Sequence, residues 1–281
     1  MAQKYFYETK LIAFIDIMGF KNIINTEKGE AIEKIINCID ESLEQYCSCL
    51  RNGTNNLKDF TGCTILDIKH PKYCLFSDSI FFYIEDEENN LIRFLFSLTH
   101  LQRTFIEKNI FIRGGLVKGQ LFEDNRKDRI NILGPGVINA HDMESKIANY
   151  PRIIIEKKLV TKLKSTLKKS PLLNIKGYLP RHVLEDNQGN YFLDYLSAPI
   201  ALSGLQTSDI NFFENHKKFI LESLENPQTN DEEERNKVIS RFLMLANYHN
   251  FVVGQINNNQ PPPELLIQMK KVENIFFKRP F

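Results

Sequence analysis

Apolar and polar positions near the start of the chain predict a buried strand that ends in a carboxylate. The residues Leu11–Ile15 are all apolar, which is typical of a central strand. Asp16 follows this run directly, and an ionised carboxylate in such a place is costly unless it is paired or ligates a cation. Gly19 comes shortly before a helical pattern. Asp16 therefore either caps that helix or belongs to a site for a metal and a phosphate.

A second apolar segment contains another isolated carboxylate. The residues Tyr73–Glu85 read YCLFSDSIFFYIE, a run rich in aromatic and β-branched residues that Ser77, Asp78 and Ser79 interrupt. This pattern predicts a β-hairpin with an acid at its turn. Two Asp residues embedded in apolar strands are what a two-metal carboxylate site requires, because Mg²⁺ and Mn²⁺ prefer hard oxygen ligands.

The rest of the chain alternates strands and helices at first and is helical afterwards. Periodicity predicts helices over 21–50 (with a break at Gly29), 91–106, 137–148, 157–169, 210–224, 232–251 and 264–277, and strands over 110–122, 130–133, 152–156 and a hairpin over 183–196. Three glycines in the strand over 110–122, Gly114, Gly115 and Gly119, indicate bulges or close backbone approach. The order predicts an α+β fold: a palm-like core in residues 1–203 and a helical C-terminal extension in residues 204–281.

Composition limits the classes of partner and compartment. The 281 residues carry a net charge of +1, which argues against a basic nucleic-acid binder. No window approaches the ~18 unbroken apolar residues of a membrane span, and the first ten residues are too polar for a signal peptide. The odd number of cysteines argues against a disulfide framework. These features predict a cytoplasmic chain that binds neither nucleic acid nor membranes.

Four blocks of sequence are similar to motifs of the class III nucleotidyl cyclases. AFIDIMGF resembles the F-x-D-I-x-G-F opening strand of that family, and FSDSI resembles its F-G-D-x hairpin, with Ser77 in the glycine position. IRGGLVKG resembles the R-x-G-x-x-x-G strand, and GPGVINAHDME resembles the start of the G-x-x-V-N-x-A helix. The blocks occur in the family's order over residues 11–155. The residues of the later blocks most resemble those of the bacterial pyrimidine cyclases of the Pycsar anti-phage systems.

This resemblance implies a ferredoxin-like βαββαβ palm that holds two divalent cations, Mn²⁺ or Mg²⁺. Asp16 and Asp78 would be the catalytic side-chain ligands, and the carbonyl of Ile17 a third ligand. The implied reaction is in-line attack of the ribose 3′-hydroxyl on the α-phosphate of a nucleoside triphosphate, with loss of pyrophosphate. The product would be a 3′,5′-cyclic nucleotide that acts as a second messenger in anti-phage defence.

The same resemblance implies where the substrate binds. The backbone N–H groups of Met18, Gly19 and Phe20, at a helix N-terminus, would receive the β- and γ-phosphates. Phe14 lies two residues before Asp16 and therefore on the same strand face, where it contacts either the sugar or base or simply the core.

Base choice is predicted from two positions. Purine cyclases place a Lys or Glu where this chain has Cys74, and their second selector aligns with Asn131. Neither purine-type pair is present, and an Asn can match the donor and acceptor pattern of a pyrimidine edge. The residues thus favour UTP or CTP, and cUMP or cCMP as product. A purine cyclase with unusual selectors is the alternative.

Two positions depart from the family pattern. The family's ribose-binding Asn aligns with Ile138, and its transition-state Arg aligns with Asp142. A pentavalent phosphate without a nearby cation loses much of its stabilisation. The candidates for a replacement cation are Lys118, Arg152 and Lys176. If none of them acts, the chain is a catalytically inactive, cyclase-like nucleotide sensor.

Three further residues in these blocks have roles that the sequence leaves open. Arg113 fits the strand motif as either a structural or a catalytic residue, Glu144 matches the Pycsar pattern without a derivable role, and His141 is expected on an exposed helix face. Class III cyclases assemble each site between two catalytic domains, and this chain has one such core. The resemblance therefore implies a head-to-tail homodimer with shared active sites.

Overall fold

The computed structural model describes residues 6–27, 29–52, 71–87, 90–124, 131–169, 182–197, 207–227, 229, 231–256, 260–268 and 277–280. Its centre is β1 (Glu8–Ile17), which pairs antiparallel with β3 (Ser79–Glu85) on one side and β4 (Ile112–Asp124) on the other. β2 (Lys72–Phe76) completes a hairpin with β3. Every residue of β1 from Leu11 to Ile17 is buried or half-buried, as its apolar pattern predicts.

The strand order confirms the predicted ferredoxin-like core. The first four strands lie in the order β2-β3-β1-β4, with α2 (Gly29–Asn52) between β1 and β2 and α4 (Asn90–Glu107) between β3 and β4. This is the βαββαβ arrangement. The break predicted at Gly29 separates α2 from a short helix α1 (Phe20–Glu27).

The sheet continues beyond β4 in short strands. β6 (Ile153–Ile155) pairs parallel to β4, and β8 (Tyr191–Leu193) and β7 (Val183–Glu185) follow as the predicted hairpin. β5 (Asn131–Leu133) pairs instead with the outer end of β4. Within the described residues this makes one mixed sheet of eight strands.

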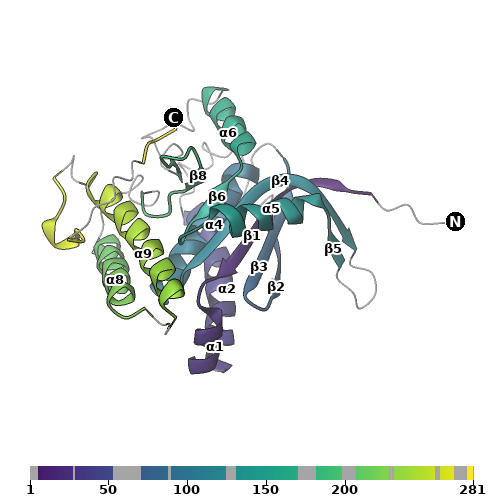
Figure 1. Cartoon of the computed structure of the whole chain (residues 1–281). Coiled ribbons are helices and arrows are strands. Elements are labelled where there is room, and N and C mark those ends of the chain that lie inside the picture. Colours follow the sequence, from purple (N-terminus) through teal and green to yellow (C-terminus); the bar gives the residue numbers. More distant parts are fainter. Residues whose placement is uncertain are drawn as a thin grey trace.

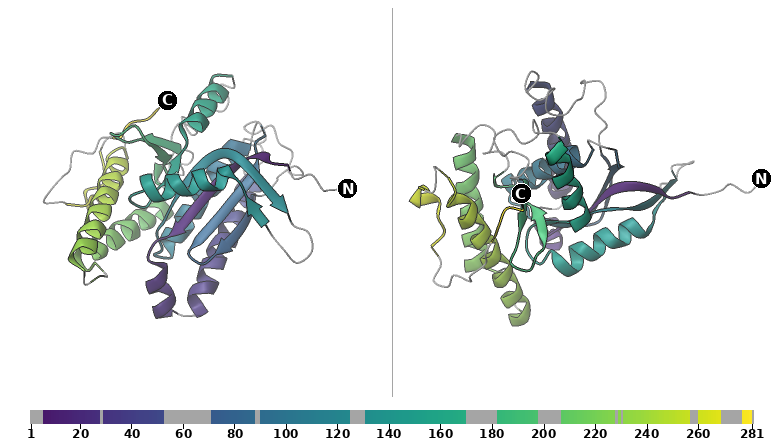
Figure 2. Two further views of the ribbon diagram at one scale, coloured as in Figure 1. Left: turned by 45° about the vertical axis from the view of Figure 1, so that its right-hand side comes forward. Right: turned by 90° about the horizontal axis from the view of Figure 1, so that it is seen from above.

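Helices cover the two faces of the sheet unequally (Figures 1 and 2). α2 and α4 lie behind the sheet in Figure 1, and α5 (Pro135–Ile147) lies in front of β1 and β4. α6 (Lys157–Lys169) adds its apolar residues to the core on the α2–α4 side. Side chains alternate along β1, so Leu11, Ala13, Ile15 and Ile17 join that core, whereas Ile12 and Phe14 pack on the α5 side.

Glycines let α5 lie directly on β4. A Cβ at Gly115 would sit 2.4 Å from the carbonyl oxygen of Ala140, and one at Gly119 would sit 2.4 Å from the Cα of Gly136. Both distances are far inside van der Waals contact. The predicted close backbone approach in this strand is therefore confirmed, and it fixes the height of α5 above the end of β1.

The C-terminal helices pack against the sheet domain in a buried cluster of their own. α8 (Thr207–Glu225) and α9 (Glu232–Val253) form an antiparallel pair whose apolar side chains share one buried cluster with Phe111 of the core. The predicted division at residue 203 falls outside the described residues and stays a prediction. The predicted last helix is wrong over its described start: a 3₁₀ turn η4 (Pro263–Leu265) gives way to extended backbone at Leu266. None of the described helices is long and apolar enough to cross a membrane.

Candidate functional site

The two predicted metal ligands lie at the same end of neighbouring strands. Asp16 pairs across the sheet with Ser79, the residue after Asp78, and on its other side with Arg113. The backbone N–H of Ile17 donates to the carbonyl oxygen of Asp78 over 2.8 Å. Because directly opposed residues in an antiparallel pair point to the same face, the side chains of Asp16 and Arg113 both lie on the α5 side.

Arg113 joins Asp16 to a third carboxylate on α5. Its Nε donates to Oδ2 of Asp16 over 2.9 Å, and the same nitrogen lies 2.8 Å from Oε1 of Glu144. That Glu144 oxygen is buried and has no hydrogen bond of good geometry, so Arg113 is hydrogen-bonded to Asp16 and ion-paired with Glu144. The side chain of Glu144 is 4% exposed, whereas those of Asp16 and Arg113 are 22% and 23% exposed.

Negative charge exceeds positive charge at this end of the sheet. Burial raises the pKa of Glu144, the charges of Asp16 and Asp78 raise it further, and Arg113 and His141 oppose the rise. Three carboxylates thus share a neighbourhood with one guanidinium. Such an arrangement favours a bound cation, which would remove the mutual repulsion of the carboxylates.

The residues present fit a divalent cation. Arg113 takes one oxygen of Asp16 and leaves the other, and the N–H of Ile17 already faces the hairpin at Asp78. In a strand the N–H and C=O of one residue point to the same side, so the Ile17 carbonyl faces the hairpin too. In the part of the chain that the structure describes, no three His, Cys, Asp or Glu side chains gather tightly enough to hold an ion alone. Mg²⁺ sites built from one or two carboxylates and substrate phosphates do not require such a group.

The turn after β1 supports only part of the predicted phosphate contacts. Gly19 adopts φ +74°, and its carbonyl accepts the N–H groups of Asn22 and Ile23, so it begins α1. The N–H of Met18, however, donates to the carbonyl of Phe111 over 2.9 Å. The prediction for the Met18 amide does not fit this arrangement, because that donor is already used within the sheet. The first amides of α1, from Phe20 on, have no partner within the helix.

Phe14 and Cys74 lie on the same sheet face as Asp16. Phe14 is half-buried and meets the ring of His141 edge-on, with centroids 5.1 Å apart. Cys74 is a half-buried free thiol opposite Phe81, whose own side chain is on the α5 side. Phe14 and Cys74 are therefore on the face of the sheet that carries Asp16, and their roles in substrate binding stay predictions.

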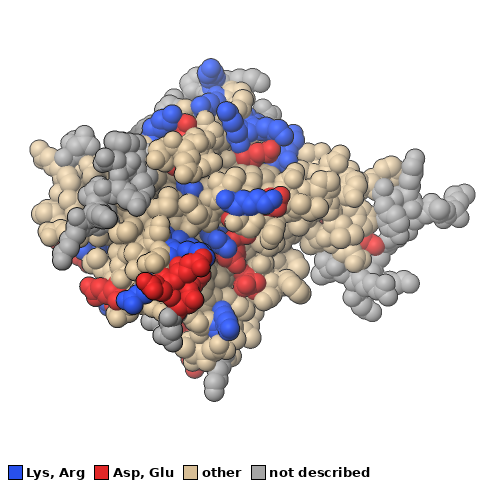
Figure 3. Space-filling view, in the orientation of Figure 1, with Lys and Arg blue, Asp and Glu red and all other residues tan. Residues whose placement is uncertain are grey.

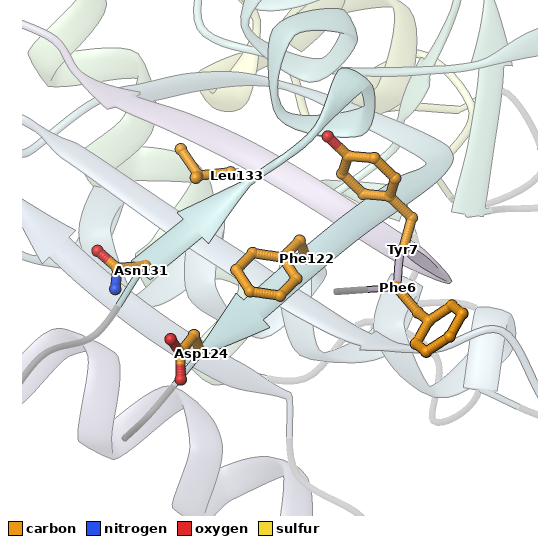
Figure 4. Close-up of a pocket in the computed structure, with 6 residues that line it drawn as sticks. All are labelled: Phe6, Tyr7, Phe122, Asp124, Asn131 and Leu133. Carbon is orange, nitrogen blue, oxygen red and sulfur yellow. The ribbon is translucent and has the colours of Figure 1, made fainter. Parts of the chain in front are cut away.

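Asn131 lies elsewhere in the same chain. It is exposed on β5 and pairs with Asp124 at the outer end of β4, whereas Arg113, the partner of Asp16 on β1, is at the other end of β4. It lines a pocket of about 410 Å³. Figure 4 shows it there with Phe6, Tyr7, Phe122, Asp124 and Leu133. The structure does not bring Asn131 and Asp16 of one chain into a common pocket.

Two of the three candidate cations have carboxylate partners away from Asp16 of their own chain. Lys118 pairs with Leu11 and so points to the α2–α4 side of the sheet, where it forms an ion pair with Asp86. Arg152 is buried in a bond of 2.8 Å to Asp186. Lys176 lies outside the described residues. Asp142, at the family's Arg position, pairs with Lys146 one turn along α5.

Glu144 is the site residue whose role the sequence left open. Ala140 packs over Gly115, and Glu144 is four residues later, so both lie on the helix face that meets β4. The sequence could have indicated this face from the spacing of Gly136, Ala140 and Glu144, which are the buried residues of α5. What it could not show is that Arg113 stands between Glu144 and Asp16.

No protein-family model and no curated protein sequence matches the chain. Solved structures are weakly similar to it. The guanylyl cyclase Cya2 aligns over 68% of this chain and 93% of its own with 13% identity and a TM-score of 0.36. The guanylyl cyclase domain of the RhoGC fusion protein from Blastocladiella emersonii aligns over 68% and 98% with 14% identity and a TM-score of 0.41. A class III adenylyl cyclase-like ATP-binding protein from Pseudomonas aeruginosa aligns over 78% of this chain and 59% of its own, with 10% identity and a TM-score of 0.32. Similarity at this level establishes neither family nor activity.

Proposed function

We propose that the chain is a nucleotidyl cyclase whose catalytic centre is the end of β1. The observation that carries the proposal is the convergence of Asp16 and Asp78, joined through the Ile17–Asp78 backbone bond, in a neighbourhood with surplus negative charge. The sequence motifs that resemble class III cyclases include both carboxylates. A site of this kind takes a polyphosphate together with its cations.

The chain's own residues have separable tasks in this reaction. Asp16, Asp78 and the Ile17 carbonyl hold two divalent cations, Mn²⁺ or Mg²⁺, which when bound would polarise the 3′-hydroxyl and neutralise the triphosphate. Arg113 fixes the rotamer of Asp16 through its Nε bond and leaves the second carboxylate oxygen available. The backbone N–H groups of Gly19, just before α1, and of Phe20, its first residue, would bind phosphate oxygens.

Within this proposal the substrate is UTP or CTP and the product cUMP or cCMP, a messenger in anti-phage defence within the cytoplasm. Cys74 supports a pyrimidine because a thiol replaces the Lys or Glu of purine cyclases on the face above Asp16.

Asn131 reaches a catalytic site only in a second copy of the chain, since in its own chain it lies at the end of β4 far from Asp16. A head-to-tail homodimer follows, and sedimentation with nucleotide and Mn²⁺ should show it. A strictly monomeric protein under those conditions would count against the shared site.

The test is to incubate the purified protein with ATP, GTP, CTP and UTP separately, with Mn²⁺, and to identify the products by mass spectrometry. A cyclic pyrimidine monophosphate from one substrate is the expected result. Cyclic AMP or GMP would retain the cyclase and refute the selector argument.

One observation favours a second candidate, a nucleotide sensor without turnover. Asp142, which is paired with Lys146, stands at the position of the family's transition-state Arg, and Lys118 and Arg152 are paired with other carboxylates. A sensor would bind one triphosphate with Mn²⁺ in equilibrium dialysis and return it unchanged. Product formation that disappears in Asp78→Asn would exclude this alternative.

A further inference from the structure

The turn after β1 and the C-terminal helices line one pocket. It measures about 360 Å³, and its core wall consists of Met18, Gly19, Asn22, Ile23, Asn109 and Phe111. The opposite wall comes from α8, α9 and the connection between them. In Figure 3 acidic and basic side chains gather on the surface where the lower end of α9 approaches the end of β1. A pocket of this size and mixed lining is in the range of small-molecule sites.

The apolar wall of the pocket is held by contacts between aromatic rings. The rings of Phe111 and Phe219 stack with centroids 4.7 Å apart, and Phe242 meets Phe111 at 5.6 Å. Phe111 also accepts the N–H of Met18 through its carbonyl. Aromatic contacts therefore tie the position of the α8–α9 pair to the backbone that leads from Asp16 to Gly19.

Arg241 supplies the positive charge of this pocket. It is the one Lys or Arg among the described residues of the lining, and its side chain is 31% exposed. Its partner Glu234 lies 3.5 Å away, from Nη1 to Oε1, which is longer than a charge-assisted hydrogen bond. Among the described residues this loose ion pair is the one that Arg241 forms, so its guanidinium keeps donors for another anion.

We propose that Arg241 binds the terminal phosphates of the substrate, so that the C-terminal extension completes the phosphate end of the active site. The inference rests on the proposed function, because it assumes a triphosphate whose reacting end lies at Asp16 and Asp78. Gly19 is three residues beyond Asp16, a span of at most ~10 Å, which a triphosphate can bridge. The planar guanidinium suits bidentate contact with phosphate oxygens.

Glu234 gives the proposal a second, opposite consequence. It competes with the phosphates for Arg241, and its own negative charge repels them. Replacing it with Gln should therefore tighten anion binding, whereas replacing Arg241 with Gln should weaken it. A residue that only shapes the fold would not produce effects of opposite sign.

The experiment measures the binding of inorganic tripolyphosphate with Mn²⁺ to the full chain by calorimetry. Arg241→Gln should weaken binding roughly tenfold or more, as expected for lost charge-assisted hydrogen bonds. Glu234→Gln should tighten binding by a few-fold, and Arg241→Lys should recover part of the loss. The matched control is Arg235→Gln, which removes an exposed charge from the same helix outside the pocket and should leave binding unchanged. Thermal melting of each variant checks that α9 remains packed.

Equal affinity in the wild-type protein and Arg241→Gln would overturn the inference, as would no measurable binding by the wild-type protein. The proposed cyclase activity is tested separately, by measuring the formation of cyclic nucleotide. A protein that binds tripolyphosphate through Arg241 but forms no cyclic nucleotide would keep this site and refute the cyclase. If Arg241→Gln formed cyclic product with an unchanged KM, the cyclase would be kept and the phosphate site at Arg241 refuted.

Discussion

Two arginine–carboxylate groups on the same sheet differ in how completely their charges are satisfied. Arg152 and Asp186 are 1% and 4% exposed, and Arg152 also donates to Tyr150, Asn149 and the carbonyl of Ile147. Arg113 is more exposed and faces two carboxylates, with a third nearby. The balanced group is an interior support. The unbalanced group is the place where we propose that a cation binds, because an added positive charge would offset the surplus of carboxylates.

The largest expected effect is a difference in stability between matched substitutions. Asp186→Asn leaves Arg152 buried without its counter-charge and should lower the free energy of unfolding by about 3–5 kcal/mol. Asp16→Asn leaves Arg113 still facing Glu144 and relieves repulsion, so it should change stability by less than about 1 kcal/mol. Urea unfolding of both variants measures the difference. Equal losses would remove the distinction between the two groups.

Turnover should show the opposite ranking. Asp16→Asn or Asp78→Asn removes a metal ligand, and even residues that only support such ligands cost about 10–100-fold when replaced. We therefore expect at least roughly 100-fold less cyclic product from either variant. Asp142→Asn, a half-exposed carboxylate paired with Lys146, is the control and should change the rate little. Initial rates at saturating substrate test this, and full activity in Asp78→Asn would refute the metal assignment.

A buried chain of hydrogen bonds through His249, His216 and Tyr195 should make the stability of the protein depend on pH. His249 donates Nε2–H to the carbonyl of Leu265, so its Nδ1 accepts from Nδ1 of His216, whose Nε2 accepts from Tyr195. Burial lowers the pKa of His249 to about 4, with the charge of Lys217 adding to this and the Leu265 bond opposing it. Burial also lowers the pKa of His216, as do His249 and Arg103.

The sign of the pH effect follows from these lowered values. Below an unfolded pKa of about 6.5 the unfolded chain binds more protons, so stability is complete above that pH and is lost as pH falls toward 4. His249 alone should cost about 2 kcal/mol between pH 7.5 and 5. Urea midpoints over this range measure the loss, and His249→Gln should flatten the dependence. An equally steep dependence in that variant would show that other groups cause it.

The smallest expected effect concerns strain at the functional hairpin. Ser77 adopts φ +55° beside Asp78, a conformation that favours glycine. Ser77→Gly should stabilise the protein by about 0.5 kcal/mol, after the larger chain entropy of glycine is subtracted. Ser79→Gly, within the regular strand, should destabilise it instead. Thermal melting of the two variants distinguishes them, and destabilisation by both would show that the turn carries no strain.

The sequence could predict the core and the meeting of Asp16 with Asp78, because apolar runs and strand ends are local features. It could not distinguish Arg113 from Arg152, since the difference depends on Asp186 and Glu144, which come from distant segments. The sequence could not show that the Met18 amide is unavailable to phosphate, because its hydrogen bond to Phe111 depends on how β1 and β4 are paired. The prediction of a helix from residue 264 is wrong over the described residues 264–268, where a 3₁₀ turn is followed by extended backbone and where Leu265 and Ile267, two residues apart, are both buried. The pocket at Arg241 arises only when α9 packs against the turn.

The most direct test is Mn²⁺ binding followed by electron paramagnetic resonance. The wild-type protein, Asp16→Asn and Asp78→Asn would be titrated with Mn²⁺ and a nucleoside triphosphate whose α,β-bridging oxygen is replaced by methylene. We expect saturable Mn²⁺ binding by the wild-type protein and its loss in both variants, without loss of fold. The same Mn²⁺ affinity in all three proteins would contradict the assignment of the end of β1 as a cation site.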